Sequence, residues 1–156
     1  MSKSSLYRAL PAARRVALVQ HAVSAFKGTR AIYAQRLVDK GGGFRVATLM
    51  TWPPDRLAKE VVRQNAETPQ DELELLQLLY VDLEPAIQIS FLDAAGVAHE
   101  NGVIAEGAEA PYASAEAVVR AADRVLAQHG DDGRHYLSVL VRYNLAGWPG
   151  LDTRVE

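Results

Sequence analysis

Histidine and aspartate side chains gather in one short stretch of the chain and have the chemistry of metal ligands. The four histidines of the sequence are His21, His99, His129 and His135. Imidazole nitrogens and carboxylate oxygens both suit zinc or manganese. The stretch 129–135, however, spans an expected helix end, turn and strand start, where aspartates are ordinary turn residues. We therefore expect no metal, and the candidate ligands, should one bind, are His129, Asp131 and His135.

A second pair, His99 and Glu100, has the side-chain types of a general base and a general acid. Adjacent residues of a strand point to opposite faces of a sheet, so this pair would not share one pocket. His21 falls on the polar side of an expected helix. We expect these three side chains to be solvated.

The sequence lacks the signatures of common active sites. It contains no G-x-x-x-x-G-K-[ST] loop, no G-x-S-x-G elbow and no H-E-x-x-H helix. The run Gly41-Gly42-Gly43 precedes an expected strand, whereas a dinucleotide-binding loop opens a helix. The absence of cysteine excludes disulfides, thiolate metal ligands and cysteine nucleophiles. We expect no catalytic residue and no cofactor, and the residues carry no resemblance to a particular family.

The charges are distributed unevenly along the chain. Residues 1–45 hold nine cations and one acid, a net charge of +8, whereas residues 46–156 hold eight cations and eighteen acids, a net charge of −10. Such a polarity is a hint of an anionic partner. The candidate anion-binding residues are Arg14, Arg15, Arg30, Arg36 and Arg45.

Aromatic residues lie close to these arginines, as they would in a surface that stacks nucleic-acid bases. They are Tyr33, Phe44 and Trp52. Phe44 and Trp52 are equally typical of a strand that faces a hydrophobic core, and the sequence pI of about 6.1 is below that of dedicated nucleic-acid binders. Binding of nucleic acid or another polyanion therefore stays an alternative.

Length and composition predict one globular domain over residues 1–156, with 1–5 and 150–156 flexible. Hydrophobic residues make up 49% of the chain and charged residues 23%, as in a folded protein. No apolar run approaches the roughly 18 residues that span a bilayer, so no membrane is expected. Gln20 and His21 interrupt the apolar stretch near the N-terminus, which favours a helix of the domain over a signal peptide. Together with the absence of cysteine, this predicts a cytoplasmic protein.

The first half of the chain predicts helices and one hairpin. Apolar spacing indicates a helix over 11–26. Residues 30–38 and 44–52 are interpreted as strands joined by the glycine-rich turn 39–43, with a helix over 30–38 as the alternative. Two further helices are predicted, at 55–65 and from Thr68 to a stop before Pro85, the second with a threonine cap and a proline in its first turn.

The second half predicts another hairpin, a helix and a final strand. Residues 87–91 alternate apolar and polar, which is typical of a half-buried strand, and 97–104 return as its partner with a bulge or turn at Asn101-Gly102. Ser114 begins a helix to 128, Gly130 ends it, 131–133 form a turn, 137–145 form a strand, and 147–150 break regular structure. The order α-ββ-αα-ββ-α-β predicts an α+β fold, a mostly antiparallel four- to five-stranded sheet with helices packed on one side.

These observations favour a small non-catalytic binding or adaptor protein that acts through protein–protein contacts. The partner is another protein or a second copy of this chain, bound through an exposed sheet edge or a helix face. Two alternatives stay open. One is polyanion binding by residues 1–45, and the other is an enzyme with an unrecognised active site.

Overall fold

The computed structural model describes residues 3–155, so residues 1, 2 and 156 of the predicted flexible tails lie outside the described part. The protein is 68% helical. Its elements fall into two compact units, Met1–Leu78 and Leu79–Glu156. The prediction of a single domain stays a prediction.

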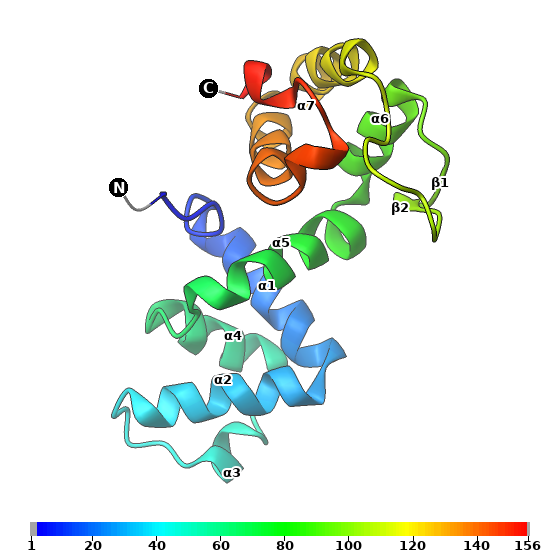
Figure 1. The fold of residues 1–156 in the computed structure, drawn as a ribbon. Coiled ribbons are helices and arrows are strands. Elements are labelled where there is room, and N and C mark those ends of the chain that lie inside the picture. Colours follow the sequence, from blue (N-terminus) through cyan, green and yellow to red (C-terminus); the bar gives the residue numbers. More distant parts are fainter. Residues whose placement is uncertain (1–2, 156) are drawn as a thin grey trace. The chain divides into compact units, whose positions relative to one another are not determined.

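In residues 3–78 every regular element of the N-terminal unit is a helix (Figure 1). Helix α1 packs against α4 above all, and also against α2 and α5. The core between them holds fully buried side chains from each of these helices, among them Leu18, Leu37, Leu57 and Leu76. The elements are α1 (Ala12–Ala25), α2 (Lys27–Asp39), α3 (Val46–Leu49), α4 (Pro54–Arg63), η1 (Pro69–Asp71) and α5 (Glu72–Leu78).

The C-terminal unit is a pair of packed helices with a small hairpin and a short C-terminal segment. Helix α6 packs against α7, and the final turns pack back on α7 as well. The elements are the π-helical turn η2 (Leu79–Leu83), α6 (Pro85–Ala95), β1 (His99–Glu100), β2 (Val103–Ile104), α7 (Ala115–Asn144), η3 (Leu145–Gly147) and η4 (Leu151–Arg154).

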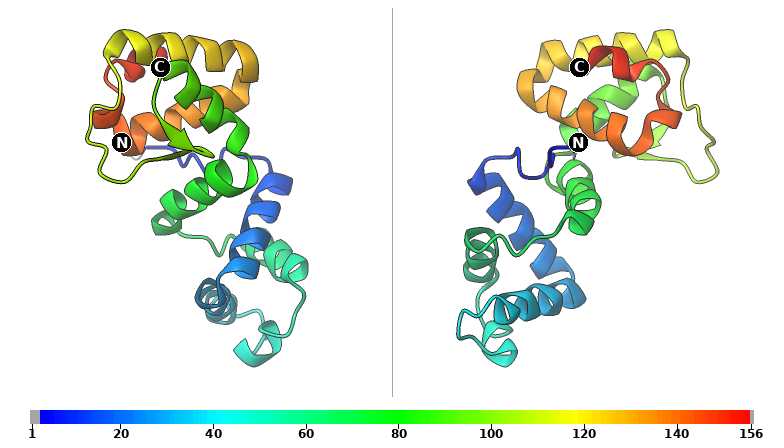
Figure 2. Two further views of the ribbon diagram at one scale, coloured as in Figure 1. Left: turned by 90° about the vertical axis from the view of Figure 1, so that its right-hand side faces the viewer. Right: turned by 60° about the vertical axis from the view of Figure 1, so that its left-hand side comes forward.

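Helix α7 is broken in the middle. Gly130 has φ 54° and ψ −129°, outside the helical region, and Figure 2 shows the second half folding back beneath the first. Gly133 lies at the point of closest approach, because a Cβ there would come within 2.8 Å of the Val125 carbonyl oxygen. Two glycines therefore allow the two halves of α7 to pack together.

Several local predictions are confirmed. The Ser114 hydroxyl accepts a hydrogen bond of 3.2 Å from the Ala117 N–H and so caps α7. Thr68 and Asp71 form a capping box at η1. The helices predicted over 11–26 and 55–65 are α1 and α4. The turn predicted at Asn101-Gly102 is present, and both residues have positive φ, but it joins β1 to β2 inside the segment 97–104 that was predicted to be one strand paired with 87–91.

The predicted α+β fold is wrong. Within residues 3–155 the only sheet is the two-stranded β1–β2 ladder, in which His99 pairs with Ile104 and Glu100 with Val103. Helix α2 replaces the predicted strand 30–38, and α3 lies inside the predicted strand 44–52. Helix α6 replaces the strand 87–91, and the second half of α7 replaces both the turn 131–133 and the strand 137–145. No sheet edge of the predicted kind is available for a partner.

The burial pattern gives the physical reason for this correction. In α6 the buried side chains include Ile87, Phe91 and Ala95, which are four residues apart and lie on one helical face, whereas Ile89 is only partly buried. In the second half of α7, Leu137 and Val139 are buried, whereas Tyr143, which a strand would place on the same face, is 39% exposed. Packing against neighbouring helices has overridden the β propensity of these segments.

Residues 151–154 form η4 and Leu151 is fully buried, so this part of the C-terminal segment belongs to the packed unit.

No single helix of residues 3–155 is long and apolar enough to cross a membrane. The consecutive helical segments Pro69–Leu83 and Pro85–Ala95 reach that length and apolarity only when they are taken together, and the pair is bent by 83°.

Candidate functional site

Three of the five candidate anion-binding arginines are bound to atoms of the N-terminal unit itself. Arg15 Nε donates to the Leu10 carbonyl at 3.2 Å. Arg30 Nη2 donates to the Trp52 carbonyl. These two guanidinium groups stabilise loop backbone, which uses part of their capacity to contact a phosphate.

Arg36 forms a two-pronged ion pair with Asp71. Its Nη1 lies 2.5 Å from Asp71 Oδ2, and its Nη2 lies 3.2 Å from Oδ1. Burial by itself raises the pKa of the Asp71 carboxyl, but hydrogen bonds from Arg36 and from the Thr68 N–H outweigh it, and the pKa lies below its ordinary value. The hydrogen bond to Asp71 in turn raises the pKa of Arg36. Arg36 is therefore a structural partner of the loop before α5.

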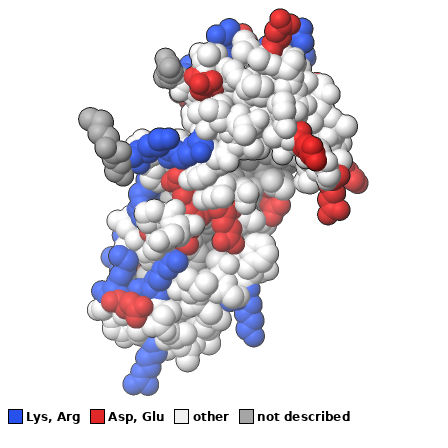
Figure 3. Space-filling view, viewed as in Figure 1, with Lys and Arg blue, Asp and Glu red and all other residues white. Residues whose placement is uncertain are grey.

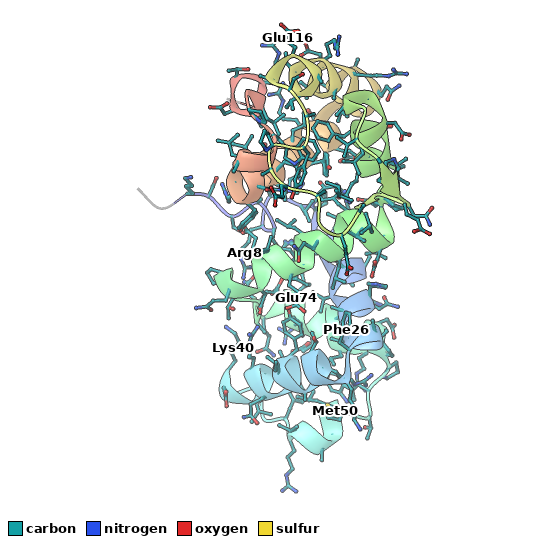
Figure 4. All side chains as sticks on the ribbon, turned by 45° about the vertical axis from the view of Figure 1, so that its right-hand side comes forward. Arg8, Phe26, Lys40, Met50, Glu74 and Glu116 are labelled. Carbon is teal, nitrogen blue, oxygen red and sulfur yellow. The ribbon has the colours of Figure 1, made fainter. Side chains whose placement is uncertain are left out.

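On the one face that Figure 3 shows, the lysine and arginine side chains of the N-terminal unit are interspersed with acidic and uncharged residues. Lys40 stands at the end of α2 and Arg8 on the segment before α1, both labelled in Figure 4. Arg8 is also engaged, because its Nη2 donates to the Glu67 carbonyl at 3.1 Å.

The charge polarity nevertheless coincides with the two units. Residues 1–78 hold twelve cations and seven acids, a net charge of +5, and residues 79–156 hold five cations and twelve acids, a net charge of −7. The N-terminal unit thus has a net positive charge and the C-terminal unit a net negative charge.

The candidate metal ligands are not brought together. His129 Nε2 lies 3.3 Å from the hydroxyl oxygen of Ser90, and His135 Nδ1 forms a hydrogen bond with the hydroxyl of Tyr80. In residues 3–155 no group of three or more histidine, aspartate or glutamate side chains has an arrangement that could hold a metal ion.

His99 holds the hairpin to α6, and its side chain is only 12% exposed, so it is not the solvated residue that the sequence predicted. Its Nδ1 accepts the Gly102 N–H at 3.0 Å, which fixes the ring proton on Nε2 in the neutral imidazole, and Nε2 lies 2.6 Å from Asp93 Oδ1. Gln88 Nε2 adds a hydrogen bond to the Gly102 carbonyl. The tip of the hairpin is therefore fixed to α6 at two places.

Beside this hairpin the C-terminal unit has an apolar cleft of about 220 Å³. Its walls come from η2, α6, the hairpin, the second half of α7 and the segment that follows. They consist mainly of apolar and aromatic side chains with a few polar groups, and the lining residues are Val81, Gln88, Leu92, Gly102, Val103, Ile104, Tyr136, Leu140, Asn144 and Trp148. Small clefts with apolar walls and a few polar groups are typical binding sites.

Trp148 is the residue that distinguishes this cleft. The side chain is 1% exposed, and its indole nitrogen is buried without a hydrogen-bond acceptor in residues 3–155. The ring is held by Phe91, with centroids 4.8 Å apart, and by Tyr112, with centroids 5.1 Å apart. A buried indole N–H usually has an acceptor. The indole N–H of Trp148, a residue that lines the cleft, is therefore a buried donor that no residue in 3–155 satisfies.

Apolar side chains at the cleft also extend into solvent. Val103 is 54% exposed and Val81 is 36% exposed, and both line the cleft. Tyr143 and Leu145, which flank the lining residue Asn144 in sequence, are 39% and 37% exposed. The cleft is thus open at a surface where large apolar groups are accessible.

The cleft cannot be recognised in the sequence because its walls come from five separate segments. The sequence held one sign of it, in the segment before the C-terminus. The run Gly147-Trp148-Pro149-Gly150 places a large amphipathic ring in a segment that cannot form a regular helix or strand. Comparison of the chain with protein-family models, curated proteins and solved structures gives no match. A proposal of function is therefore based on the side-chain geometry of the C-terminal unit.

Proposed function

We propose that the protein is a binding protein whose C-terminal unit takes a large apolar side chain of a partner protein into the Trp148 cleft. The observation that carries this proposal is the unsatisfied indole N–H of Trp148 at an apolar wall. Because that nitrogen is buried, the side chains around it have to move aside, and a backbone carbonyl of the bound segment would then accept the hydrogen bond. Leaving such a donor buried and unpaired costs about 1–3 kcal/mol, so a ligand that pairs it gains affinity.

The charge of the unit favours a cationic segment. The C-terminal unit has a net charge of −7, and acidic residues adjoin the cleft in sequence. Asp82 follows Val81, and Glu106 closely follows the hairpin. Opposite charges at an interface steer association and select among partners. The proposed partner segment therefore carries lysine or arginine next to its apolar residue.

The test uses short synthetic peptides with a fluorescent label and the full-length protein. One peptide has a leucine flanked by lysines, a second has alanine in place of the leucine, and a third has glutamates in place of the lysines. Fluorescence anisotropy measures each affinity. The proposal predicts that the first peptide binds most tightly and that added salt weakens it.

Two variants with matched exposure make the test specific. Val103 is 54% exposed at the cleft and Ile32 is 53% exposed on α2. Val103→Asn is expected to weaken binding of the leucine peptide about tenfold, because the apolar contact is lost, whereas Ile32→Asn leaves it unchanged. Equal affinities of the leucine and alanine peptides, or equal effects of the two variants, would contradict the proposal.

A further inference from the structure

A second, polar cleft lies on the C-terminal unit, between α6 and the first half of α7. Its volume is about 170 Å³. Ser90, Asp93 and Ala94 contribute from α6, and Arg124 and Gln128 from α7. The α6 residues are three and four positions apart and the α7 residues are four apart, so each set lies on one helical face. Two rigid helices therefore position all of these side chains.

Arg124 and Asp93 face this cleft with opposite charges, yet they do not pair with each other. No carboxylate of residues 3–155 lies within 4.0 Å of the Arg124 guanidinium nitrogens. Asp93 uses Oδ1 for the His99 ring, 2.6 Å away, and its side chain remains 66% exposed. A cation and an anion that line the same cleft without forming an ion pair leave space for a ligand that carries both charges.

The neutral side chains of the cleft are loosely held. The Ser90 hydroxyl oxygen lies 3.4 Å from Gln128 Oε1 and 3.3 Å from His129 Nε2. Both distances exceed the usual 2.7–2.8 Å of a hydroxyl hydrogen bond. The serine hydroxyl and the glutamine amide are therefore available to a ligand without loss of strong internal hydrogen bonds.

We propose that this cleft binds a small zwitterion of the free α-amino acid class. Arg124 would take the carboxylate in the two-pronged geometry that guanidinium favours, and Asp93 would take the ammonium group. The volume is that of roughly five or six water molecules, which suits a molecule with about six non-hydrogen atoms, such as alanine. The lining residues of this cleft are separate from those of the Trp148 cleft, although Asp93 also binds His99, which holds the hairpin to α6.

The test is a titration of the full-length, ¹⁵N-labelled protein with L-alanine, followed by backbone amide shifts of residues 90–94 and 124–129. Acetate carries only the carboxylate and methylammonium only the cation, and they serve as comparison ligands at equal ionic strength. The proposal predicts saturable, millimolar binding of L-alanine. Each comparison ligand is expected to bind about tenfold more weakly, because it lacks one charged contact.

Two variants test the charged side chains of the cleft, and a third controls for the loss of an arginine elsewhere on α7. Arg124→Gln and Asp93→Asn are each expected to weaken L-alanine binding about tenfold, and asparagine can still accept the hydrogen bond from His99. Arg120→Gln, one turn earlier on α7 and outside the cleft lining, is expected to leave it unchanged. Acetate binding as tightly as L-alanine would show a plain carboxylate site and overturn the proposal. So would unshifted amides at concentrations well above millimolar, or an Arg120→Gln effect equal to that of Arg124→Gln.

Discussion

Gly147 makes room for the ring of Tyr112. A Cβ at position 147 would lie 2.6 Å from Tyr112 Cε2, and the Tyr112 N–H donates to the Gly147 carbonyl at 3.0 Å. Tyr112 in turn packs against Trp148. The shape of the Trp148 cleft therefore depends on a glycine next to the tryptophan.

Gly147→Ala is expected to destabilise the C-terminal unit by about 1–3 kcal/mol, because the Tyr112 ring, packed on Trp148, has to move. The chain has one tryptophan in each unit, so Trp148 fluorescence in a Trp52→Phe background reports urea unfolding of this unit alone. Gly28→Ala, in the N-terminal unit where a Cβ meets no atom within 4 Å, should leave the Trp148 transition unchanged and so checks that the signal is specific to the C-terminal unit. Equal midpoints for Gly147→Ala and its parent would show that the contact is not tight.

Gly133→Ala tests the packing of the two halves of α7. The added Cβ would approach the Val125 carbonyl oxygen to 2.8 Å and Val125 Cγ1 to 2.9 Å. A backbone atom cannot move aside as a flexible side chain can, so we expect a loss of about 1–3 kcal/mol. The same Trp148 measurement checks it. A neutral result would mean that the halves of α7 are farther apart than the structure has them.

The Arg36–Asp71 pair predicts a pH dependence for the N-terminal unit. The pKa of Asp71 is lower in the folded protein than in the unfolded chain, so its stabilisation is fully present above the unfolded value of about 3.9. It is lost as the pH falls through the folded value. Trp52 fluorescence in a Trp148→Phe background should therefore show a falling free energy of unfolding below about pH 4.

Asp71→Asn should make that decline less steep and cost about 1–3 kcal/mol at neutral pH, because a hydrogen-bonded ion pair is lost. Asp55→Asn is the control. It removes an exposed pair with Lys59, whose nitrogen lies 3.8 Å from the carboxylate, and should change stability by about 0.5 kcal/mol or less. Equal pH profiles for Asp71→Asn and the parent would rule out Asp71 as the titrating group.

Tyr7 and Glu67 tie the N-terminal segment to the loop before α5. The Tyr7 hydroxyl donates to Glu67 Oε2 at 2.5 Å, and the other carboxylate oxygen is buried without a hydrogen bond, although Arg8 Nη2 lies 4.0 Å away. Burial and this hydrogen bond raise the pKa of Tyr7, so the phenol stays a donor.

Tyr7→Phe would leave both Glu67 oxygens without a donor, and we expect it to cost about 1–3 kcal/mol. Replacing both partners removes the unsatisfied charge, so the double variant Tyr7→Phe, Glu67→Met should be more stable than Tyr7→Phe alone. Urea unfolding followed by Trp52 fluorescence compares the parent, the single variants Tyr7→Phe and Glu67→Met, and the double variant. Simple addition of the two single effects would mean that the residues are not coupled.

The sequence predicted correctly where local chemistry decides the structure. The Ser114 cap, the Thr68 capping box and the break at Gly130 each depend on a few neighbouring residues, and all three are present. It failed where the same apolar residues fit two periodicities. Ile87, Ile89 and Phe91 alternate as in a strand, but Ile87 and Phe91 also lie one helical turn apart, and packing of α6 against α7 selects the helix.

The sites were harder to predict than the elements. The predicted anion-binding set rested on charge along the chain, whereas partners such as Asp71 are 35 residues away from Arg36. The Trp148 cleft depends on where the hairpin lies against α6, which is fixed by His99 and Gln88. Contacts of this kind follow only from the folded arrangement.

The most direct test of the Trp148 cleft is the indole ¹H–¹⁵N resonance of Trp148 in the full-length Trp52→Phe protein. Addition of the lysine-flanked leucine peptide should move the indole proton downfield and slow its exchange with solvent, because a carbonyl of the peptide accepts its hydrogen bond. The alanine peptide should leave the resonance in place. Saturating binding of the leucine peptide with an unmoved Trp148 resonance would contradict the proposed function.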